Sequence, residues 1–341
     1  MKKKEFIVLT WVGFLWTIIL VLILSFFNVD EPYEVAKKDI GHEFTVYSKN
    51  NLETSFASID GAIAYAKSLK QASVRSKLDG QLYWNNYDDF TVYQTEKMIA
   101  DFAQFQEAVR YAKKFRDTKI YFNQGTSPVW ENINIPPITN IIDAPLISQM
   151  PELPRGCEVT SLTMLLQYAG VKVDKMKLAA QIKRDPTPYE KRDGVTYFGN
   201  PYDGFVGDMY SFSNPGYGVY HGPIRELVEL YMPDQIIDMT GSEFQDILYS
   251  LDYGIPVWVI VNTNFSRLSD SLFETWQTPT GQVSITYKEH SVLITGYDET
   301  FIYFNDPLAY IKNRKIPIRS FQEGWEQMGK QAITYVEDQT T

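Results

Sequence analysis

The longest hydrophobic run of the sequence lies at its N-terminus. No residue between Phe6 and Phe27 carries a charge, and a helix of this length spans about 33 Å, enough to cross a bilayer core. Lysines precede the run and acidic residues follow it, so the positive-inside rule keeps the N-terminus in the cytoplasm. We predict a single-pass signal anchor in the cell membrane over residues 1–28, a linker over residues 29–43, and an extracellular remainder. The alternative is a cleaved signal peptide.

Hydrophobic positions then recur with an offset of 46 residues. Phe44-Thr45-Val46-Tyr47 returns as Phe90-Thr91-Val92-Tyr93. Each copy predicts a strand, a helix and two short strands. The apolar residues at helical spacing are Phe56, Ile59, Ile63 and Ala66 in the first copy and Phe102, Phe105, Val109 and Ala112 in the second.

We assign these two small α/β repeats to residues 44–89 and 90–135. Trp84 and Trp130 occupy equivalent positions, and the repeated aromatic residues either fill two small cores or form a binding surface. No residue type suited to catalysis recurs, so we interpret the repeats as accessory.

A different pattern begins after the helix-breaking Pro136-Pro137. Residues 140–338 predict an α+β domain in which a helix packs on an antiparallel sheet. The helix runs from Cys157 to Ala169 and ends at Gly170. Helical spacing also marks segments near Glu243 to Leu251 and Phe321 to Met328, and apolar strands are expected at Val257–Val261, His290–Tyr297, Phe301–Phe304 and Ala332–Tyr335. The glycine- and aromatic-rich stretch from Gly199 to Gly222 predicts a long loop beside a cleft.

The amino-acid composition excludes several classes of function. The 44% hydrophobic and 15% aromatic residues can fill real cores. A net charge of −10 repels phosphate backbones, so nucleic acid is not an expected partner, whereas basic substrates suit the charge better. The single cysteine excludes an internal disulfide and a thiolate zinc site. Phosphate-loop and dinucleotide motifs are missing, so neither a cofactor nor a metal is expected.

That cysteine, Cys157, follows Gly156 at the predicted start of a helix. Unpaired backbone N–H groups and the helix dipole stabilise a thiolate at this position, although the neighbouring Glu158 opposes them slightly. A strong nucleophile also needs an imidazole partner. The alternative is a small buried hydrophobic residue.

Three histidines compete for the role of base. His290 opens a strand that forms a hairpin with the next strand, and this pairing brings it near Asp306, which can orient the imidazole. Asn305 and Asp298 compete with Asp306 for that role. A structural core histidine is the alternative for His290.

The two remaining histidines have weaker cases. His221 lies just ahead of a predicted helix, and we interpret it as loop or cleft lining, with catalysis as the alternative. His42 lies outside the domain. Gln149, eight residues before Cys157, can supply an N–H group to an oxyanion beside the backbone N–H of Cys157.

These motifs together resemble the leader-peptidase-like cysteine peptidases related to bacteriocin-processing proteases. The resemblance covers residues 140–338 and rests on Gly156 to Leu166 with Gln149 upstream, Gly254 to Val259, His290 to Tyr297, and Asn305-Asp306-Pro307. It implies a papain-like fold with Cys157 as nucleophile, His290 as base, Asp306 as orienting residue and Gln149 in the oxyanion hole. No transporter portion accompanies these motifs, so leader cleavage is not carried over.

The expected activity is hydrolysis of peptide bonds through a thioester formed on Cys157. A cell-wall amidase, isopeptidase or transpeptidase could use the same residues on cell-wall peptides. From a different class, a catalytically inactive surface protein could use the repeats for binding.

Overall fold

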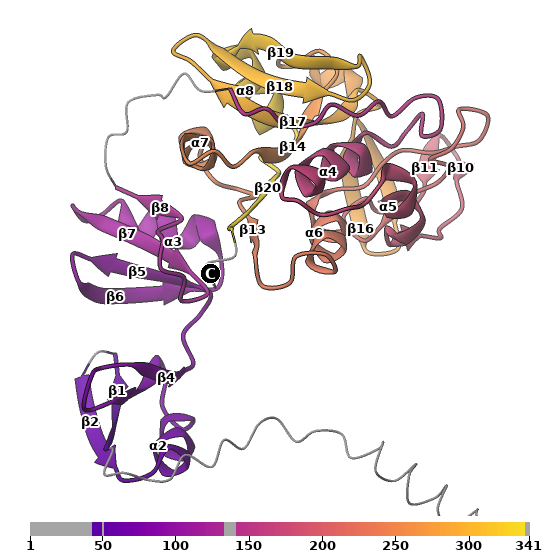
Figure 1. Cartoon of the computed structure of the whole chain (residues 1–341). Coiled ribbons are helices and arrows are strands. Elements are labelled where there is room, and N and C mark those ends of the chain that lie inside the picture. Colours follow the sequence, from indigo (N-terminus) through magenta and orange to yellow (C-terminus); the bar gives the residue numbers. More distant parts are fainter. Residues whose placement is uncertain (1–42, 50, 133–140, 338–341) are drawn as a thin grey trace, which may run out of the picture.

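The computed structural model describes residues 43–49, 51–132 and 141–337. Two small units precede a larger domain in which helices pack on an antiparallel sheet (Figure 1). The predicted signal anchor over residues 1–28 lies outside the described residues. Within the described ranges, no helix combines the length and apolar character needed to cross a membrane.

The two small units have the same order of elements. The first consists of β1 (Phe44–Ser48), β2 (Asn51–Phe56), α2 (Ile59–Ala66), β3 (Ala72–Ser76) and β4 (Leu82–Asn85). The second consists of β5 (Phe90–Gln94), β6 (Lys97–Phe102), α3 (Phe105–Ala112), β7 (Thr118–Phe122) and β8 (Trp130–Glu131). Their sheets are ordered β2-β1-β3-β4 and β6-β5-β7-β8, so equivalent strands take equivalent places.

Each unit contains one strand more than the sequence pattern predicts. Phe56 and Phe102 were expected in helices, but they end strands β2 and β6, where they pair with Phe44 and Phe90. The helices begin three residues later; the first is capped by Ser58, whose Oγ accepts from a backbone N–H. Strand β2 is an edge strand and mostly exposed, so its polar residues conceal it from a search for hydrophobic alternation.

The two units differ in how they relate to the larger domain. The first has its own small core, which includes Val46 and Val74. The core of the second continues into that of the larger domain. At this junction the buried Asp246 accepts hydrogen bonds from Lys113 Nζ at 2.8 Å and Trp130 Nε1 at 3.1 Å. Trp130 therefore helps to dock the second unit.

The larger domain is built on a six-stranded sheet in which every neighbouring pair is antiparallel. The strands, in spatial order, are β13 (Ile236–Asp238), β20 (Ala332–Tyr335), β14 (Val257–Asn262), β17 (Glu289–Tyr297), β18 (Phe301–Asp306) and β19 (Ile311–Pro317). The helices are α4 (Cys157–Tyr168), α5 (Lys175–Gln181), α6 (His221–Glu229), α7 (Phe244–Asp252) and α8 (Ile318–Gln327), with a 3-10 turn η1 (Asp270–Leu272).

Smaller strands complete the domain. A second sheet has the order β10 (Glu190–Arg192), β11 (Val195–Tyr197), β15 (Glu274–Thr278) and β16 (Gly281–Ile285), and β9 (Arg184–Asp185) pairs with β12 (Phe205–Val206). Strand β12 lies inside the segment predicted as a loop from Gly199 to Gly222, and α6 begins just before its end. The other helices and strands predicted for this domain are confirmed.

Helix α4 is anchored against the central strands. All six residues of β14 are buried, and Trp258 Nε1 on this strand donates to the backbone oxygen of Glu158 at 3.0 Å. The helix ends as predicted at Gly170, whose φ of 86° places it in the left-handed region. The N–H of Val171 then returns to the carbonyl of Leu166 at 2.9 Å, which satisfies a terminal acceptor. The first turn of α4 is therefore fixed relative to the sheet.

Candidate active site

Cys157 is the first residue of α4, as the sequence predicts. Gly156 brings the chain in tightly, because a Cβ at that position would lie only 2.6 Å from Leu153 Cβ. The cysteine is 6% exposed. It lines a pocket of about 330 Å³ together with Gln149 and His290, so three of the four predicted site residues meet at one cavity.

The fourth residue, Asp306, contacts His290 directly. Strands β17 and β18 pair so that Leu293 lies opposite Asn305, and His290 Nε2 is 3.0 Å from Asp306 Oδ1. Burial raises the pKa of Asp306, but hydrogen bonds from His290, Ala309 N–H and Arg314, with the charge of His290, lower it to about 2. Asp306 is therefore ionised near neutral pH, so Nε2 must carry the hydrogen and Nδ1 remains for proton exchange.

The residues that compete with Asp306 have other partners. Asn305 donates to the carbonyls of Ala144 and Pro145 at 3.1 and 3.0 Å. Asp298 accepts from the backbone N–H groups of the turn between β17 and β18. Of the three candidates, Asp306 is the one that the structure brings to His290.

The side chain of Gln149 lies in the pocket, but both of its N–H groups are engaged. Nε2 donates to the carbonyl of Leu153 at 3.3 Å and to that of Pro154 at 2.9 Å. Its Oε1 is buried and has no hydrogen-bond partner in the described part of the chain. A role in the oxyanion hole therefore requires the longer of the two bonds to give way.

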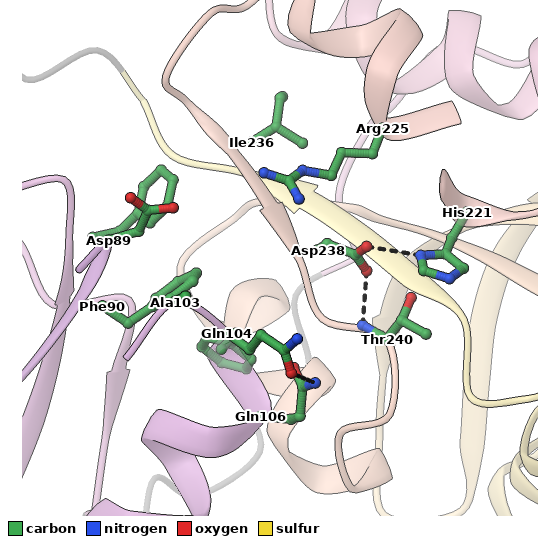
Figure 2. A pocket seen from close by; sticks show the side chains of 12 residues that line it. Asp89, Phe90, Ala103, Gln104, Gln106, His221, Arg225, Ile236, Asp238 and Thr240 are labelled. Carbon is green, nitrogen blue, oxygen red and sulfur yellow. Dashed lines mark hydrogen bonds and ion pairs between the residues drawn. The ribbon is translucent and has the colours of Figure 1, made fainter. Parts of the chain in front are cut away.

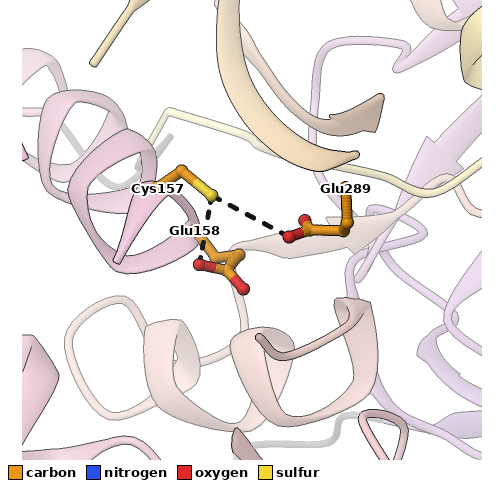
Figure 3. A group of neighbouring side chains, drawn as sticks. All are labelled: Cys157, Glu158 and Glu289. Atoms are coloured by element: carbon orange, nitrogen blue, oxygen red, sulfur yellow. Dashed lines mark hydrogen bonds between the residues drawn. The ribbon is translucent and has the colours of Figure 1, made fainter. Parts of the chain in front are cut away.

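The sulfur of Cys157 lies beside two acidic side chains, Glu158 and Glu289 (Figure 3). The thiol donates to Glu158 Oε2 at 3.3 Å, and Glu289 Oε2 lies 4.0 Å away. Across the described ranges, no hydrogen bond joins this sulfur to His290. The three side chains offer ligand atoms within 4.8 Å of one another, a spacing that could hold a metal ion.

This environment reverses the expectation of a thiolate stabilised by the helix dipole. Burial, Glu158 and Glu289 raise the pKa of Cys157 well above its usual value, whereas the backbone N–H of Ser291 lowers it. The helix terminus contributes less than these effects because the sulfur is buried beside two acidic groups. The resting site therefore holds a thiol.

The carboxyl groups are themselves perturbed. Burial raises the pKa of Glu158 to about 7, although hydrogen bonds that include one from the backbone N–H of Val219 to Oε1 at 2.7 Å oppose the change. Burial and the charge of Glu158 raise the pKa of Glu289 well above its usual value. Gly218 makes room for both groups, since a Cβ there would lie 2.3 Å from Glu158 Oε1 and 3.1 Å from Glu289 Oε2.

His221 lies at a different pocket (Figure 2). It is the first residue of α6, and its Nδ1 is 2.7 Å from Asp238 Oδ2. The pocket, of about 190 Å³, is also lined by Asp89, which immediately precedes β5, and by Gln104 of the second small unit. His221 is thus cleft lining, as interpreted from the sequence, but the cleft is not that of Cys157. His42 lies outside the described residues.

Three residues of the site were missed in the sequence. Glu289 immediately precedes His290, and this adjacency could have drawn attention to it. Arg314 Nη1 reaches Asp306 Oδ2 at 2.7 Å from strand β19 and stacks over Phe265, which meets the His290 ring edge to face. Neither of these two had a local signal, because both depend on contacts between separate segments.

A cysteine at the start of a helix, sharing a pocket with a His–Asp pair on an antiparallel sheet, defines a papain-like arrangement. Residues 141–333 match the Peptidase_C39 like family. This match covers more than half of the chain, and the chain belongs to that family.

Two relatives agree with this assignment. The chain is 47% identical over 194 residues to an uncharacterized protein, YvpB, of Bacillus subtilis (strain 168), an alignment that covers 56% of this chain and 74% of that protein. It is also similar to a crystal structure described as a candidate C39-like peptidase from Bacillus anthracis, with 48% identity and a TM-score of 0.55. That similarity covers 58% of this chain and 98% of the crystallised one.

Proposed function

We propose that this protein is a cysteine peptidase that cleaves peptide bonds through a thioester on Cys157. The observation that carries the proposal is the pocket shared by Cys157 and His290, with Asp306 hydrogen-bonded to the far nitrogen of the imidazole. Membership of a peptidase-like family supports the same chemistry.

In the proposed reaction, the Cys157 thiol turns from Glu158 Oε2 toward His290, whose Nδ1 takes the proton as the sulfur attacks the scissile carbonyl. The resulting oxyanion receives hydrogen bonds from the backbone N–H of Cys157 and from Gln149 Nε2. His290 then gives the proton to the leaving amine, and the C–N bond breaks to leave a thioester. Water, deprotonated by His290, hydrolyses the thioester and regenerates the thiol. Asp306 holds the imidazole orientation throughout and stabilises its cationic form.

We further propose that the signal anchor over residues 1–28 places this site outside the cell, at the membrane surface. There the substrates would be surface peptides or cell-wall peptides. An amidase, isopeptidase or transpeptidase differs only in the amide attacked or in the group that resolves the thioester, so the same residues would serve it.

The test uses the full-length protein in detergent micelles, with a fluorogenic peptide library and purified cell-wall peptides as substrates. Cys157→Ala and His290→Ala should each reduce turnover by about 10³-fold or more. His221→Ala is the matched control, because His221 also pairs with an aspartate but lines another pocket. Turnover that survives in Cys157→Ala would refute the proposal, as would an equal loss in His290→Ala and His221→Ala.

A further inference from the structure

The pocket beside Cys157 contains acceptors that lack donors. Glu289 Oε1 and Gln149 Oε1 are both buried, and neither has a hydrogen-bond partner among the described residues. Gln149 is only 2% exposed, and both residues line the pocket. Buried acceptors without partners are costly, so a ligand rich in N–H donors would satisfy this pocket.

The same place holds two acidic groups that lack a cationic partner in the part of the chain that the structure describes. Within the described ranges, Glu158 and Glu289 form no ion pair with Lys, Arg or His. Arg155 also lines the pocket, but its guanidinium donates to the backbone carbonyls of Asp208 and Ser211. Ionisation of Cys157, Glu158 and Glu289 together would place three negative charges side by side, which is unfavourable unless a cation enters.

We propose that Glu289 is a specificity-determining residue that binds a primary ammonium group of the substrate next to the scissile bond, with Glu158 reinforcing the negative potential behind it. This inference rests on the proposed peptidase function and adds the substrate class. The ammonium belongs to a free α-amine or to a lysine side chain.

The short distance to the nucleophile sets where the cation must lie. Glu289 Oε2 is 4.0 Å from Cys157 Sγ, so an ammonium bound to it lies within a few ångströms of the attacked carbonyl. An α-amine is about 2.5 Å from the carbonyl carbon of its own residue. A lysine reaches the same point by folding its flexible side chain back.

Aromatic rings border the acidic groups. Tyr217 and Tyr287 line the pocket with their rings edge to face at 6.1 Å. Tyr287 is 59% exposed, and an exposed ring at the mouth of an acidic pocket attracts a cation to its face. The net charge of −10 over the whole chain also favours the approach of cationic peptides.

The first experiment measures charge preference without relying on hydrolysis. Full-length protein is treated with 2-aminoethyl methanethiosulfonate, which carries a primary ammonium, or with neutral methyl methanethiosulfonate. In both cases the Cys157 thiolate attacks the sulfenyl sulfur, a protein–reagent disulfide forms, and methanesulfinate leaves with the electron pair. The reaction rate with the cationic reagent is divided by the rate with the neutral reagent, and this ratio is divided by the same ratio for free cysteine. The result should be about ten in the native protein.

Glu289→Gln should bring that ratio close to one. Glu299→Gln is the matched control, because Glu299 is an exposed glutamate in the turn at the opposite end of β17; it should keep the native ratio. Unfolding curves of both variants establish that they are folded. A native ratio near one, or a ratio that Glu289→Gln leaves unchanged, would overturn the inference.

The second experiment identifies the source of the ammonium. Two pairs of substrates are compared. The first pair is a peptide with a free or an acetylated α-amine, and the second is an acetylated peptide with lysine or norleucine before the scissile bond. EDTA is present to remove any metal ion bound by Cys157 and the two glutamates. At least one pair should differ about tenfold in kcat/KM, and Glu289→Gln should abolish the difference.

Two outcomes separate the two proposals. Cleavage of all four substrates at equal rates would overturn the ammonium preference while leaving the peptidase function intact. Cleavage of none would count against the peptidase function, and the labelling ratio would still decide whether Glu289 binds a cation.

Discussion

Replacing Glu158 by glutamine should make Cys157 more reactive. The change removes a negative charge that lies 3.3 Å from the sulfur. At an effective dielectric constant of ~20, repulsion between a carboxylate and a thiolate at this distance is about 5 kcal/mol. This is an upper limit, because Glu158 has a pKa of about 7 and can relieve the repulsion by taking up a proton.

We expect the pKa of Cys157 to fall by about 2 units in Glu158→Gln, which corresponds to about 2.7 kcal/mol. The thiolate population below that pKa would then rise about 100-fold. A less basic thiolate is also less nucleophilic, with a Brønsted coefficient of about 0.5, so the net gain in alkylation rate is about tenfold. Glutamine still offers an oxygen to the N–H of Val219, which preserves the hydrogen bond that positions the side chain.

The assay is the rate of alkylation of full-length protein by iodoacetamide between pH 6 and 9, followed by mass spectrometry of the peptide that contains Cys157. Glu299→Gln again provides an exposed Glu→Gln control and should match the native curve. If Glu158→Gln has the same rate as the native protein throughout this pH range, the charge of Glu158 does not control the thiol, and the reasoning is refuted.

Two further predictions concern stability. Asp306 has a pKa of about 2 in the folded protein and an ordinary value of 3.8, so its carboxylate stabilises the fold by about 2 kcal/mol above pH ~4, and this contribution disappears as the pH falls through 2. Urea titrations should show that Asp306→Asn lacks this pH dependence of stability, and an equal dependence in both proteins would contradict the prediction. Asp246→Ala leaves the buried N–H of Trp130 without an acceptor and should lower the unfolding free energy by about 1–3 kcal/mol. Asp246→Asn loses only the ion pair with the half-exposed Lys113 and should lower it by less than about 1 kcal/mol. Equal losses in the two variants would mean that Trp130 does not depend on this acceptor.

Much of the larger domain could be predicted because its key elements are local in sequence. The start of α4 follows from a glycine before an amphipathic stretch, and its end follows from Gly170. The pairing of His290 with Asp306 follows from a hairpin whose two strands are joined by three residues. In each case the signal lies within a short segment, where periodicity and turn chemistry determine the structure.

The features that escaped prediction depend on contacts between distant segments or on burial. Arg314 reaches Asp306 because β19 pairs with β18. Asp246 meets Trp130 across more than a hundred residues. Strands β2 and β6 lie at sheet edges, and β2 is mostly exposed, which weakens the hydrophobic alternation that reveals a strand.

The pKa of Cys157 shows most clearly that the position of a residue in a helix does not by itself determine its ionisation. A helix N-terminus favours a thiolate, and Glu158 was expected to oppose it only slightly. Both arguments treat the sulfur as partly solvated. In the structure it is buried, and folding brings Glu289 to the same place from strand β17. In a medium of low dielectric constant two nearby carboxyl groups outweigh the half charge of a helix end.

The acidic pair beside the nucleophile affects how the proposed enzyme would select substrates. Without a cation, Cys157 stays a thiol, so the site would react slowly with neutral and anionic peptides. A substrate ammonium that pairs with Glu289 removes part of the repulsion that keeps the thiol protonated. It therefore lowers the cost of forming the thiolate at the moment when a carbonyl is in place. On this reasoning the cation preference should appear in kcat as well as in KM, because the ammonium acts on the nucleophile and not only on binding.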